Sequence, residues 1–256
     1  MQEEILEGGN VNQVVRIGDT VRRTLGPWSE AVHQLLRHLK ARGFEGAPRF
    51  LGVDEQGREM LSYLEGEVGF MPYAWSEASL VEAARLLRRY HDATIGFVVP
   101  EAANWGWVHP NSSRHEVICH LDFAPYNIVF RDEKPHALID FDFAGPGPRV
   151  WDVAIAAYWF VPLSFGEDMG GGNLRDDLDD GSRRLKLLCS TYGIEADSEL
   201  LDTVEQRLEF ICGLIRTRSA AGEPAWQKML EEGHLAHWER ELATFKQYRP
   251  QIEKNL

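Results

Sequence analysis

Short apolar runs broken by turn residues open the chain, and this pattern predicts β-strands. Within residues 5–23, β-type runs at 14–17 and 20–23 flank a Gly-Asp turn at 18–19. A further turn is expected at Gly8-Gly9-Asn10. Because these runs are too short for helices and are joined by tight turns, we expect an antiparallel meander.

One amphipathic segment and a second pair of strands follow this meander. Apolar residues recur at helical spacing from about residue 29, and Gly43 ends the pattern. The positions that share this spacing are Ala31, Val32, Leu35, Leu36 and Leu39. Two strands are then expected at 48–53 and 60–64, around a turn at 54–57.

Helical spacing dominates the rest of the chain, apart from one predicted hairpin. We expect a helix at 76–95, a strand at 117–119, a hairpin of 128–130 with 137–141, and helices from 150 onward, broken at 166–181. Segregated strands and helices favour an α+β fold of two lobes. We place a small antiparallel-sheet lobe at residues 1–65 and a mainly helical lobe at 66–256.

Composition and charge limit the classes of partner. With 256 residues and 44% hydrophobic content the chain can bury two cores, and 27 Lys+Arg against 40 Asp+Glu give a net charge of −13. Nucleic acid is therefore not expected as a partner. The first seven residues are acidic and polar, and the chain has no apolar run long enough to span a membrane. The three cysteines are widely spaced, so we expect reduced thiols in a cytoplasmic protein with no membrane partner.

The segment from His120 to Asn127 carries the strongest chemical signal. It has the form H-x-D-x-x-x-x-N, the pattern of a phosphoryl-transfer catalytic loop. Asp122 is suited to orient an attacking hydroxyl and accept its proton, with His120 as a supporting residue. Asn127 offers a carbonyl oxygen to a hard magnesium ion.

Asp140 makes this signal stronger. It lies thirteen residues beyond Asn127, at the end of the predicted strand, and a hairpin would return it beside the catalytic loop. Asn127 and Asp140 are sufficient protein ligands for Mg²⁺ when ATP supplies further oxygens. A purely structural alternative has His120 and Asp122 capping a turn and Asp140 ending a strand.

These residues resemble a known family, the aminoglycoside phosphotransferase and choline-kinase-like group, which are protein-kinase relatives that phosphorylate small molecules. The resemblance covers about residues 8–160 and rests on His120-x-Asp122-x-x-x-x-Asn127, Ile139-Asp140-Phe141-Asp142, Asp152 after Gly145-Pro146-Gly147-Pro148, and Leu87-Arg88-Arg89-Tyr90-His91. It implies a kinase-like fold. Protein kinases commonly carry a lysine two residues after the catalytic Asp, whereas this chain has Ala124, so a protein substrate is disfavoured.

The resemblance also implies nucleotide-binding residues in the first lobe. The Gly8-Gly9 turn offers backbone amides to phosphate. The family's phosphate-binding lysine on the third strand has no counterpart here, and the candidates in its place are Arg22 and Arg23. Strand alternation directs one of the two into the cleft, and we favour Arg23. Glu30 is a candidate partner for that arginine, although it also suits the first turn of a helix.

Three further features have both a functional and a structural interpretation. Backbone groups of residues 62–65, including Ser62 and Leu64, would face adenine if the resemblance extends through the segment that joins the lobes. Asp142 is suited either to assist magnesium or to cap a turn. His91 and Asp152 are interpreted as structural, with Asp152 organising the loop below the catalytic Asp.

The sequence therefore predicts an ATP- and Mg²⁺-dependent phosphotransferase that acts on a hydroxyl group of a small molecule. A cationic acceptor is left open, as is the choice between ATP and GTP. The alternative is a kinase-fold binding or immunity protein of weak catalytic power that protects against a toxic compound. It is motivated by the missing lysine and by the opening residues 6–10 and 14–39, which look similar to the trifolitoxin-immunity-like branch of the same superfamily.

Overall fold

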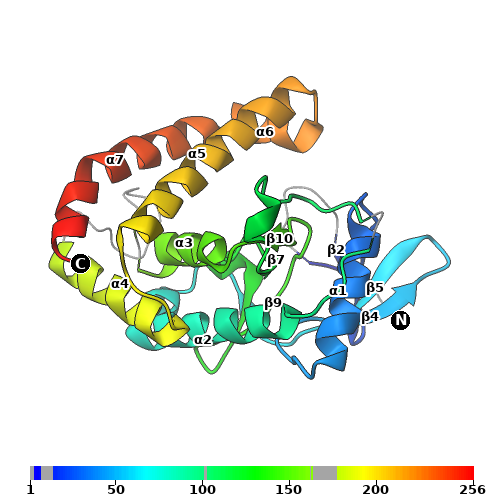
Figure 1. Cartoon of the computed structure of the whole chain (residues 1–256). Coiled ribbons are helices and arrows are strands. Elements are labelled where there is room, and N and C mark those ends of the chain that lie inside the picture. The colour runs from blue at the N-terminus through cyan, green and yellow to red at the C-terminus, as the bar shows by residue number, and fades with distance from the viewer. Residues whose placement is uncertain (1–2, 7–13, 101–102, 162, 164–177) are drawn as a thin grey trace. The chain divides into compact units, whose positions relative to one another are not determined.

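The computed structural model describes residues 3–6, 14–100, 103–161, 163 and 178–256 (Figure 1). Two compact units are distinguished: the first combines residues 1–69 and 86–152, and the second combines 70–85 and 153–256. The predicted α+β class is confirmed. The predicted lobe boundary between residues 65 and 66 stays a prediction. The two compact units are a different division, in which residues 86–152, including the predicted catalytic loop, belong with the N-terminal sheet.

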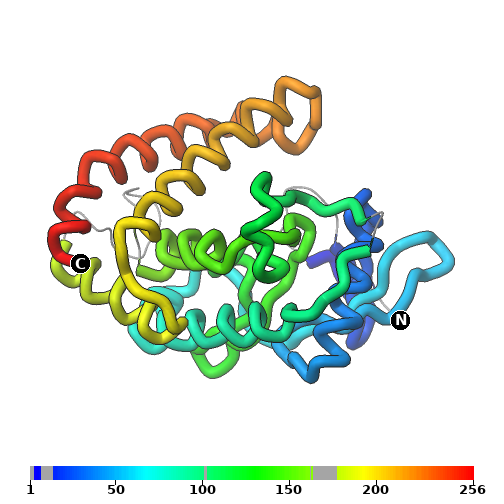
Figure 2. Tube along the Cα trace, viewed as in Figure 1, coloured from blue at the N-terminus to red at the C-terminus, as the bar shows by residue number. Residues whose placement is uncertain are grey.

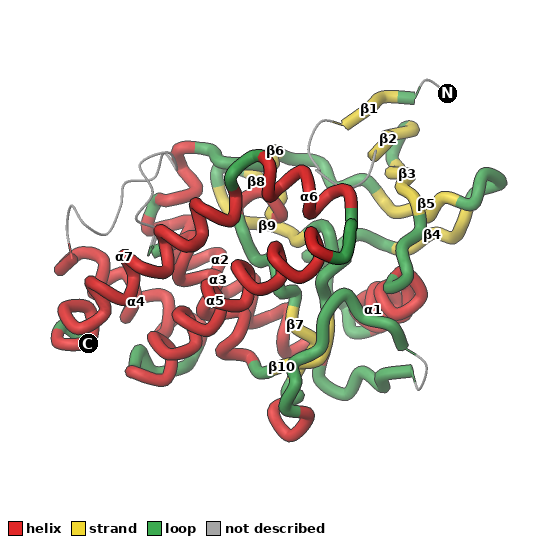
Figure 3. The backbone as a smooth tube through the Cα atoms, turned by 90° about the horizontal axis from the view of Figure 1, so that it is seen from above, coloured by secondary structure: helices red, strands yellow, loops and turns green. Residues whose placement is uncertain are grey.

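A five-stranded antiparallel sheet begins the first unit, in the order β1-β2-β3-β5-β4 (Figure 3). Its strands are β1 (Glu4–Leu6), β2 (Val14–Ile17), β3 (Thr20–Thr24), β4 (Phe50–Val53) and β5 (Arg58–Ser62). Arg23 of β3 lies directly across from Glu59 of β5. This cross-strand pairing brings opposite charges together, which stabilises an antiparallel pair.

Helix α1 (Ser29–Ala41) fills the predicted position. Its apolar residues at i, i+3 and i+4 spacing are buried, among them Val32, Leu35 and Leu39. Gly43 adopts φ +72° after the helix, a left-handed conformation that glycine accepts without strain and that ends the helical ladder. The helix buries its stripe, and its residues contact β4.

A helix and several short strands complete the first unit. They are the C-terminal part of α2 (Glu77–Thr94), the short helices η2 (Ser112–Arg114) and η3 (Pro125–Asn127), the pair β7 (Val117–Cys119) with β10 (Gly145–Gly147), and the sheet β6-β8-β9 (Glu67–Val68, Ile128–Arg131 and Lys134–Leu138). The predicted hairpin is thus present. Its second strand ends at Leu138 rather than at residue 141, because Asp140 adopts φ +60° and leaves the extended conformation.

Helices make up the second unit, as the spacing predicted. They are η1 (Pro72–Trp75), the start of α2, most of α3 (Arg149–Phe160), α4 (Leu178–Tyr192), α5 (Ser198–Ala220), α6 (Pro224–Glu231) and α7 (His234–Lys254). Helices α5 and α7 run side by side, with α6 at one end of the pair (Figures 1 and 2). Helix α4 begins at Leu178, inside the predicted break at 166–181, of which residues 166–177 lie outside the described part.

The buried guanidinium of Arg184 in α4 caps the C-terminal end of helix α3. Its guanidinium donates to the carbonyl oxygens of Val161 at 2.6 Å, Phe160 at 2.8 Å and Trp75 at 2.8 Å. The last carbonyls of a helix have no partner within it, and Arg184 supplies one. The side chain therefore stabilises this helix end without a carboxylate in these contacts.

We expect Arg184→Met to lower the free energy of unfolding by about 2–4 kcal/mol, because buried carbonyl groups would lose their donors. The adjacent Arg183 is a matched control: its side chain is 52% exposed and pairs with Glu77 and Asp180 at the surface. Arg183→Met should cost less than about 1 kcal/mol. Urea denaturation of both variants measures the difference, and equal losses would contradict the capping role.

No helix among the described residues combines the length and the apolarity needed to cross a bilayer.

Candidate active site

The predicted catalytic loop connects β7 to η3 and β8. The Asp122 carboxylate accepts hydrogen bonds from the Tyr126 hydroxyl at 2.8 Å and from the Asn127 amide nitrogen at 2.7 Å. The same amide nitrogen donates to the main-chain oxygen of Asp122 at 3.0 Å. Because its nitrogen faces Asp122, the Asn127 amide turns its carbonyl oxygen the other way. The loop thus fixes a carboxylate and an amide oxygen in defined orientations.

Asp152 holds the start of this loop from below. Its carboxylate accepts hydrogen bonds from the main-chain N–H groups of His120 at 2.6 Å and Leu121 at 2.9 Å. Leu121 adopts φ +69°, which is unfavourable for a side chain branched beyond Cβ and persists only where neighbours enforce it. Asp152 therefore does organise the loop below Asp122, as the sequence predicted.

Asp140 is brought to the loop by hydrogen bonds on both sides of Ile139. The Ile139 N–H donates to the main-chain oxygen of Asn127 at 2.9 Å, and its oxygen accepts from His120 Nε2 at 3.0 Å. The next residue, Asp140, then turns with φ +60° and exposes 49% of its side chain. The hairpin thus places the predicted metal ligand beside the predicted catalytic loop.

Arg23, and not Arg22, faces Asp140. Its guanidinium contacts three carboxylates: Nη1 lies 3.0 Å from Asp140, Nη2 lies 2.7 Å from Asp142, and Nε donates to Glu59. Burial tends to lower the pKa of Arg23, but the surrounding carboxylates raise it above its ordinary value. The guanidinium is therefore held permanently charged in a nearly buried position.

Glu59 and His33 support Arg23 from behind, and sequence analysis missed both. Glu59 is 1% exposed and accepts from Arg23, while its second oxygen lies 2.6 Å from His33 Nε2. The His33 ring stacks on Phe50 at 3.7 Å between centroids. Burial tends to raise the pKa of Glu59, but the His33 hydrogen bond and the Arg23 charge lower it below the ordinary value. The signal that could have identified Glu59 is its spacing on β5: it is a charged residue two positions from Leu61, on the same buried face of the strand.

The Asp142 carboxyl group is 15% exposed and lies against Arg23. Burial raises its pKa to about 6, although the attraction of Arg23 acts in the opposite direction. The main chain of Asp142 packs directly against Gly106. A Cβ atom on Gly106 would lie only 2.0 Å from the main-chain oxygen of Asp142, so no larger residue fits there. A similar approach occurs at Gly145, where a Cβ atom would lie 1.7 Å from the Trp107 oxygen. The segment around Gly106 thus locks the Asp142 turn in place.

The donor set of this site fits a magnesium ion. Asp140 and Asp142 present carboxylate oxygens and Asn127 presents an amide oxygen, which are the hard ligands that Mg²⁺ prefers. Three carboxylates face a single guanidinium, so negative charge is in excess around Arg23. A divalent cation would neutralise this excess.

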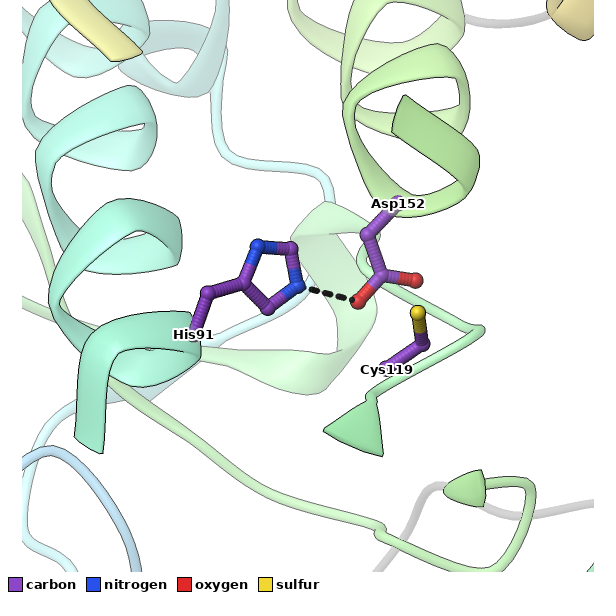
Figure 4. A group of neighbouring side chains, drawn as sticks. All are labelled: His91, Cys119 and Asp152. Atoms are coloured by element: carbon purple, nitrogen blue, oxygen red, sulfur yellow. Dashed lines mark hydrogen bonds and ion pairs between the residues drawn. The ribbon is translucent and has the colours of Figure 1, made fainter. Parts of the chain in front are cut away.

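A second polar group, formed by His91, Cys119 and Asp152, is a structural hub (Figure 4). Their possible ligand atoms lie within 4.8 Å of one another, and all three residues are buried. His91 Nε2 bonds to the Asp152 carboxylate at 3.0 Å, and burial lowers the pKa of His91. Because N–H groups of His91, His120 and Leu121 already occupy this carboxylate, it serves the catalytic loop rather than a metal ion.

The other predicted site residues lie elsewhere or outside the described part. Arg22 lies 3.6 Å from the Asp54 carboxylate, and Glu30 accepts from Gln34 on the surface of α1. Glu59 thus replaces Glu30 as the partner of the buried arginine, because β3 and β5 are direct neighbours in the sheet. Gly8 and Gly9 lie outside the described residues.

The predicted adenine-facing segment is partly occupied by sheet hydrogen bonds. The N–H of Ser62 donates to the main-chain oxygen of Arg49 at 2.9 Å, and the N–H of Tyr63 donates to the main-chain oxygen of Asp19 at 2.8 Å. Leu64 follows them and is half-buried. The N–H groups of Ser62 and Tyr63 are thus engaged within the first unit, and the adenine contact at residues 62–65 stays a prediction.

Comparison with known proteins places this site in a family. The model of the phosphotransferase enzyme family matches residues 70–188, which include the predicted catalytic loop and Asp140. The trifolitoxin immunity protein of Rhizobium leguminosarum bv. trifolii is 40% identical over 200 residues, which is 76% of each chain. This chain belongs to the phosphotransferase enzyme family. The predicted resemblance is confirmed.

Solved kinases share the fold of this phosphotransferase-family chain. A choline/ethanolamine kinase family protein from Mesorhizobium loti aligns with TM-score 0.62 and 17% identity over 99% of this chain and 93% of its own. An amicoumacin kinase in complex with AMP-PNP, Ca²⁺ and Ami gives a TM-score of 0.67 and 13% identity, over 99% of this chain and 88% of its own. An ADP-bound aminoglycoside phosphotransferase gives 0.55 and 12%, over 99% and 94%. The predicted kinase-like fold is therefore confirmed.

Proposed function

We propose that the protein transfers a phosphoryl group from Mg·ATP to a hydroxyl group of a small molecule. One observation carries this proposal: a hydrogen bond joins Asn127 to Asp122, and the hydrogen bonds of Ile139 to Asn127 and His120 bring the next residue, Asp140, to the same loop. This is the set of groups that phosphoryl transfer requires in one place. Family membership and the nucleotide-bound kinases that share the fold support it.

Asp122 orients the attacking hydroxyl in this proposal and accepts its proton. The hydrogen bonds from Tyr126 and Asn127 hold the carboxylate in one orientation, so little reorganisation is needed when the acceptor arrives. Asn127 and Asp140, with Asp142 in reach of Arg23, would hold the metal. When bound, magnesium neutralises charge on the phosphates.

Arg23 replaces the family lysine as the phosphate-binding cation of the first lobe. A guanidinium presents a planar fork of N–H donors that matches phosphate oxygens. The backbone near Leu64 completes the proposed nucleotide site among the described residues, and phosphate binding by Gly8 and Gly9 stays an expectation from the sequence. The acceptor class follows the kinases of the same fold, whose substrates include aminoglycosides and amicoumacin. A cytoplasmic location stays a prediction.

The immunity relative favours a second candidate function. Because a protein that is 40% identical to this chain is a trifolitoxin immunity protein, protection against a toxic compound is the second candidate for its physiological role. Protection by phosphorylation and protection by binding alone make opposite predictions about ATP. A nucleotide titration therefore separates them.

Calorimetric titration with ATP tests the proposed function. We expect binding that requires Mg²⁺ and that weakens by about 10- to 100-fold or more in Asp140→Ala, because a metal ligand is lost. Asp180→Ala is the matched control, since it removes an exposed carboxylate from α4. Absence of binding at millimolar ATP in the wild-type protein would overturn the proposal and favour protection by binding alone.

A further inference from the structure

Every nitrogen of the Arg23 guanidinium is occupied by a carboxylate. Nε donates to Glu59, Nη1 lies 3.0 Å from Asp140 and Nη2 lies 2.7 Å from Asp142. The last two residues belong to the proposed metal site. In this structure, therefore, the positive charge in contact with Asp140 and Asp142 is the Arg23 guanidinium.

The far side of Arg23 is fixed. Glu59 holds Nε, His33 holds Glu59 at 2.6 Å, and Phe50 stacks on the His33 ring. The side chains of Glu59 and His33 are only 1% and 5% exposed, so this anchor lies within the first unit. Glu59 and His33 thus position Arg23, whose two Nη nitrogens face Asp140 and Asp142.

The other side of Arg23 opens toward solvent. Asp140 is 49% exposed, whereas Glu59 is buried, so the charge network runs from the interior to the surface. Carboxylate and phosphate oxygens are alternative partners for the same guanidinium fork. A nucleotide that arrives here competes with Asp140 and Asp142 for Arg23.

We infer that Arg23 couples metal binding to nucleotide binding by exchanging Asp140 and Asp142 for phosphate oxygens. This inference rests on the proposed function and assigns Arg23 a role that the family lysine position alone does not define. Without nucleotide, Arg23 neutralises the two carboxylates and weakens their attraction for a divalent cation. With nucleotide, the phosphates take up Arg23 and release the carboxylates to the metal.

Electrostatics fixes the sign of the expected effect. A guanidinium in contact with two metal-binding carboxylates repels a divalent cation bound to the same groups. Removing this charge should strengthen metal binding by about tenfold or more, even though Arg23 also orients the carboxylates. The same change should weaken metal-free nucleotide binding, because the phosphates lose a cation. Opposite shifts are a signature that structural damage would not produce.

The test measures Mn²⁺ binding to nucleotide-free protein by electron paramagnetic resonance of the free ion, and binding of metal-free AMP-PNP by calorimetry. The variant Arg23→Gln/Glu59→Gln removes the charge of Arg23 together with the opposite charge of Glu59, so that neither is left buried alone. Because Arg23 contacts Asp140 and Asp142 directly and Glu59 lies behind it, loss of the positive charge dominates at the metal ligands. We expect Mn²⁺ affinity to rise by about tenfold or more and AMP-PNP affinity to fall by a similar factor.

Arg22→Gln is the matched control. It removes the same charge from the adjacent residue, whose guanidinium lies 3.6 Å from Asp54 instead of at the metal site. Its Mn²⁺ affinity should stay within about twofold of wild type, because the Arg22 charge is paired with Asp54 and not with Asp140 or Asp142. Adding Asp140→Asn to the double variant should abolish the gain, which locates the bound ion.

Unchanged or weaker Mn²⁺ binding by the folded double variant would overturn the inference. If that variant does not fold, Arg23→Gln decides, since it removes the guanidinium charge and leaves Glu59 its hydrogen bond with His33; no rise in Mn²⁺ affinity would again overturn the inference. The proposed function fails separately: if Mn²⁺ affinity responds but no ATP is consumed with any acceptor, Arg23 balances the carboxylates in a protein that is not a kinase.

Discussion

Replacing Asp122 with Asn is expected to lower turnover by about 10²- to 10⁴-fold while nucleotide affinity stays within about twofold of wild type. An amide cannot accept the proton of the attacking hydroxyl. The shape of the side chain is kept, and the Tyr126 hydroxyl can reverse to accept a hydrogen bond, so the loop conformation should survive. ADP release in the presence of an active acceptor measures turnover, and calorimetry measures nucleotide affinity.

Tyr126→Phe is the control for this prediction. It removes one hydrogen bond of the Asp122 carboxylate and leaves the carboxylate itself in place, so turnover should fall by less than about tenfold. Wild-type turnover by a folded Asp122→Asn protein would show that another group accepts the proton. An equal loss in both variants would show that orientation, and not proton transfer, limits the reaction.

The second large effect is expected at Asp152, where replacement with Ala should lower the free energy of unfolding by about 3–5 kcal/mol. The carboxylate is fully buried and accepts from His91, His120 and Leu121. Without it, three buried donors lose their partner and Leu121 is no longer held in its unfavourable conformation. Chemical denaturation measures the loss. Should the Ala variant fail to fold, Asp152→Asn takes its place.

Asp92→Ala provides the matched control, because Asp92 is 44% exposed and pairs with Arg88 and Arg149 near the surface. It should cost less than about 1 kcal/mol. A similar cost for both variants would contradict the role assigned to Asp152.

The Asp152 contribution also depends on pH. Burial tends to raise the pKa of Asp152, but the His91 hydrogen bond and further donors lower it below the ordinary value. A carboxylate with a lowered pKa stabilises the fold fully above its unfolded value and loses this contribution as pH falls through the folded value. The stability difference between wild type and Asp152→Asn should therefore shrink below about pH 4.

Local patterns in the sequence carried much of the fold. The stripe of α1, the turn before Arg58 and the hairpin that returns Asp140 all follow from spacings within a few residues, and the structure contains each of them. The spacing of His120, Asp122 and Asn127 likewise indicated a catalytic loop. Its geometry was predictable because a short loop allows few arrangements of these side chains.

Contacts between distant segments were not predictable in the same way. Arg23 meets Glu59 because β3 pairs with β5 in a particular register, and it meets Asp140 across 117 positions of the chain. The sequence analysis chose Glu30 as the arginine's partner, since Glu30 is near in sequence. A strand can pair with several neighbours and registers, and only the packing of the whole unit selects one of them.

The sequence by itself determined the α+β class, the catalytic loop and the candidate ligands Asn127 and Asp140, because local spacing specifies secondary structure and a short motif specifies its own chemistry. Only the tertiary structure decided that the Arg23 guanidinium contacts both Asp140 and Asp142, and that Glu59 and His33 anchor it. The physical reason is that strand register and the burial of charge depend on the free energy of the whole packed unit.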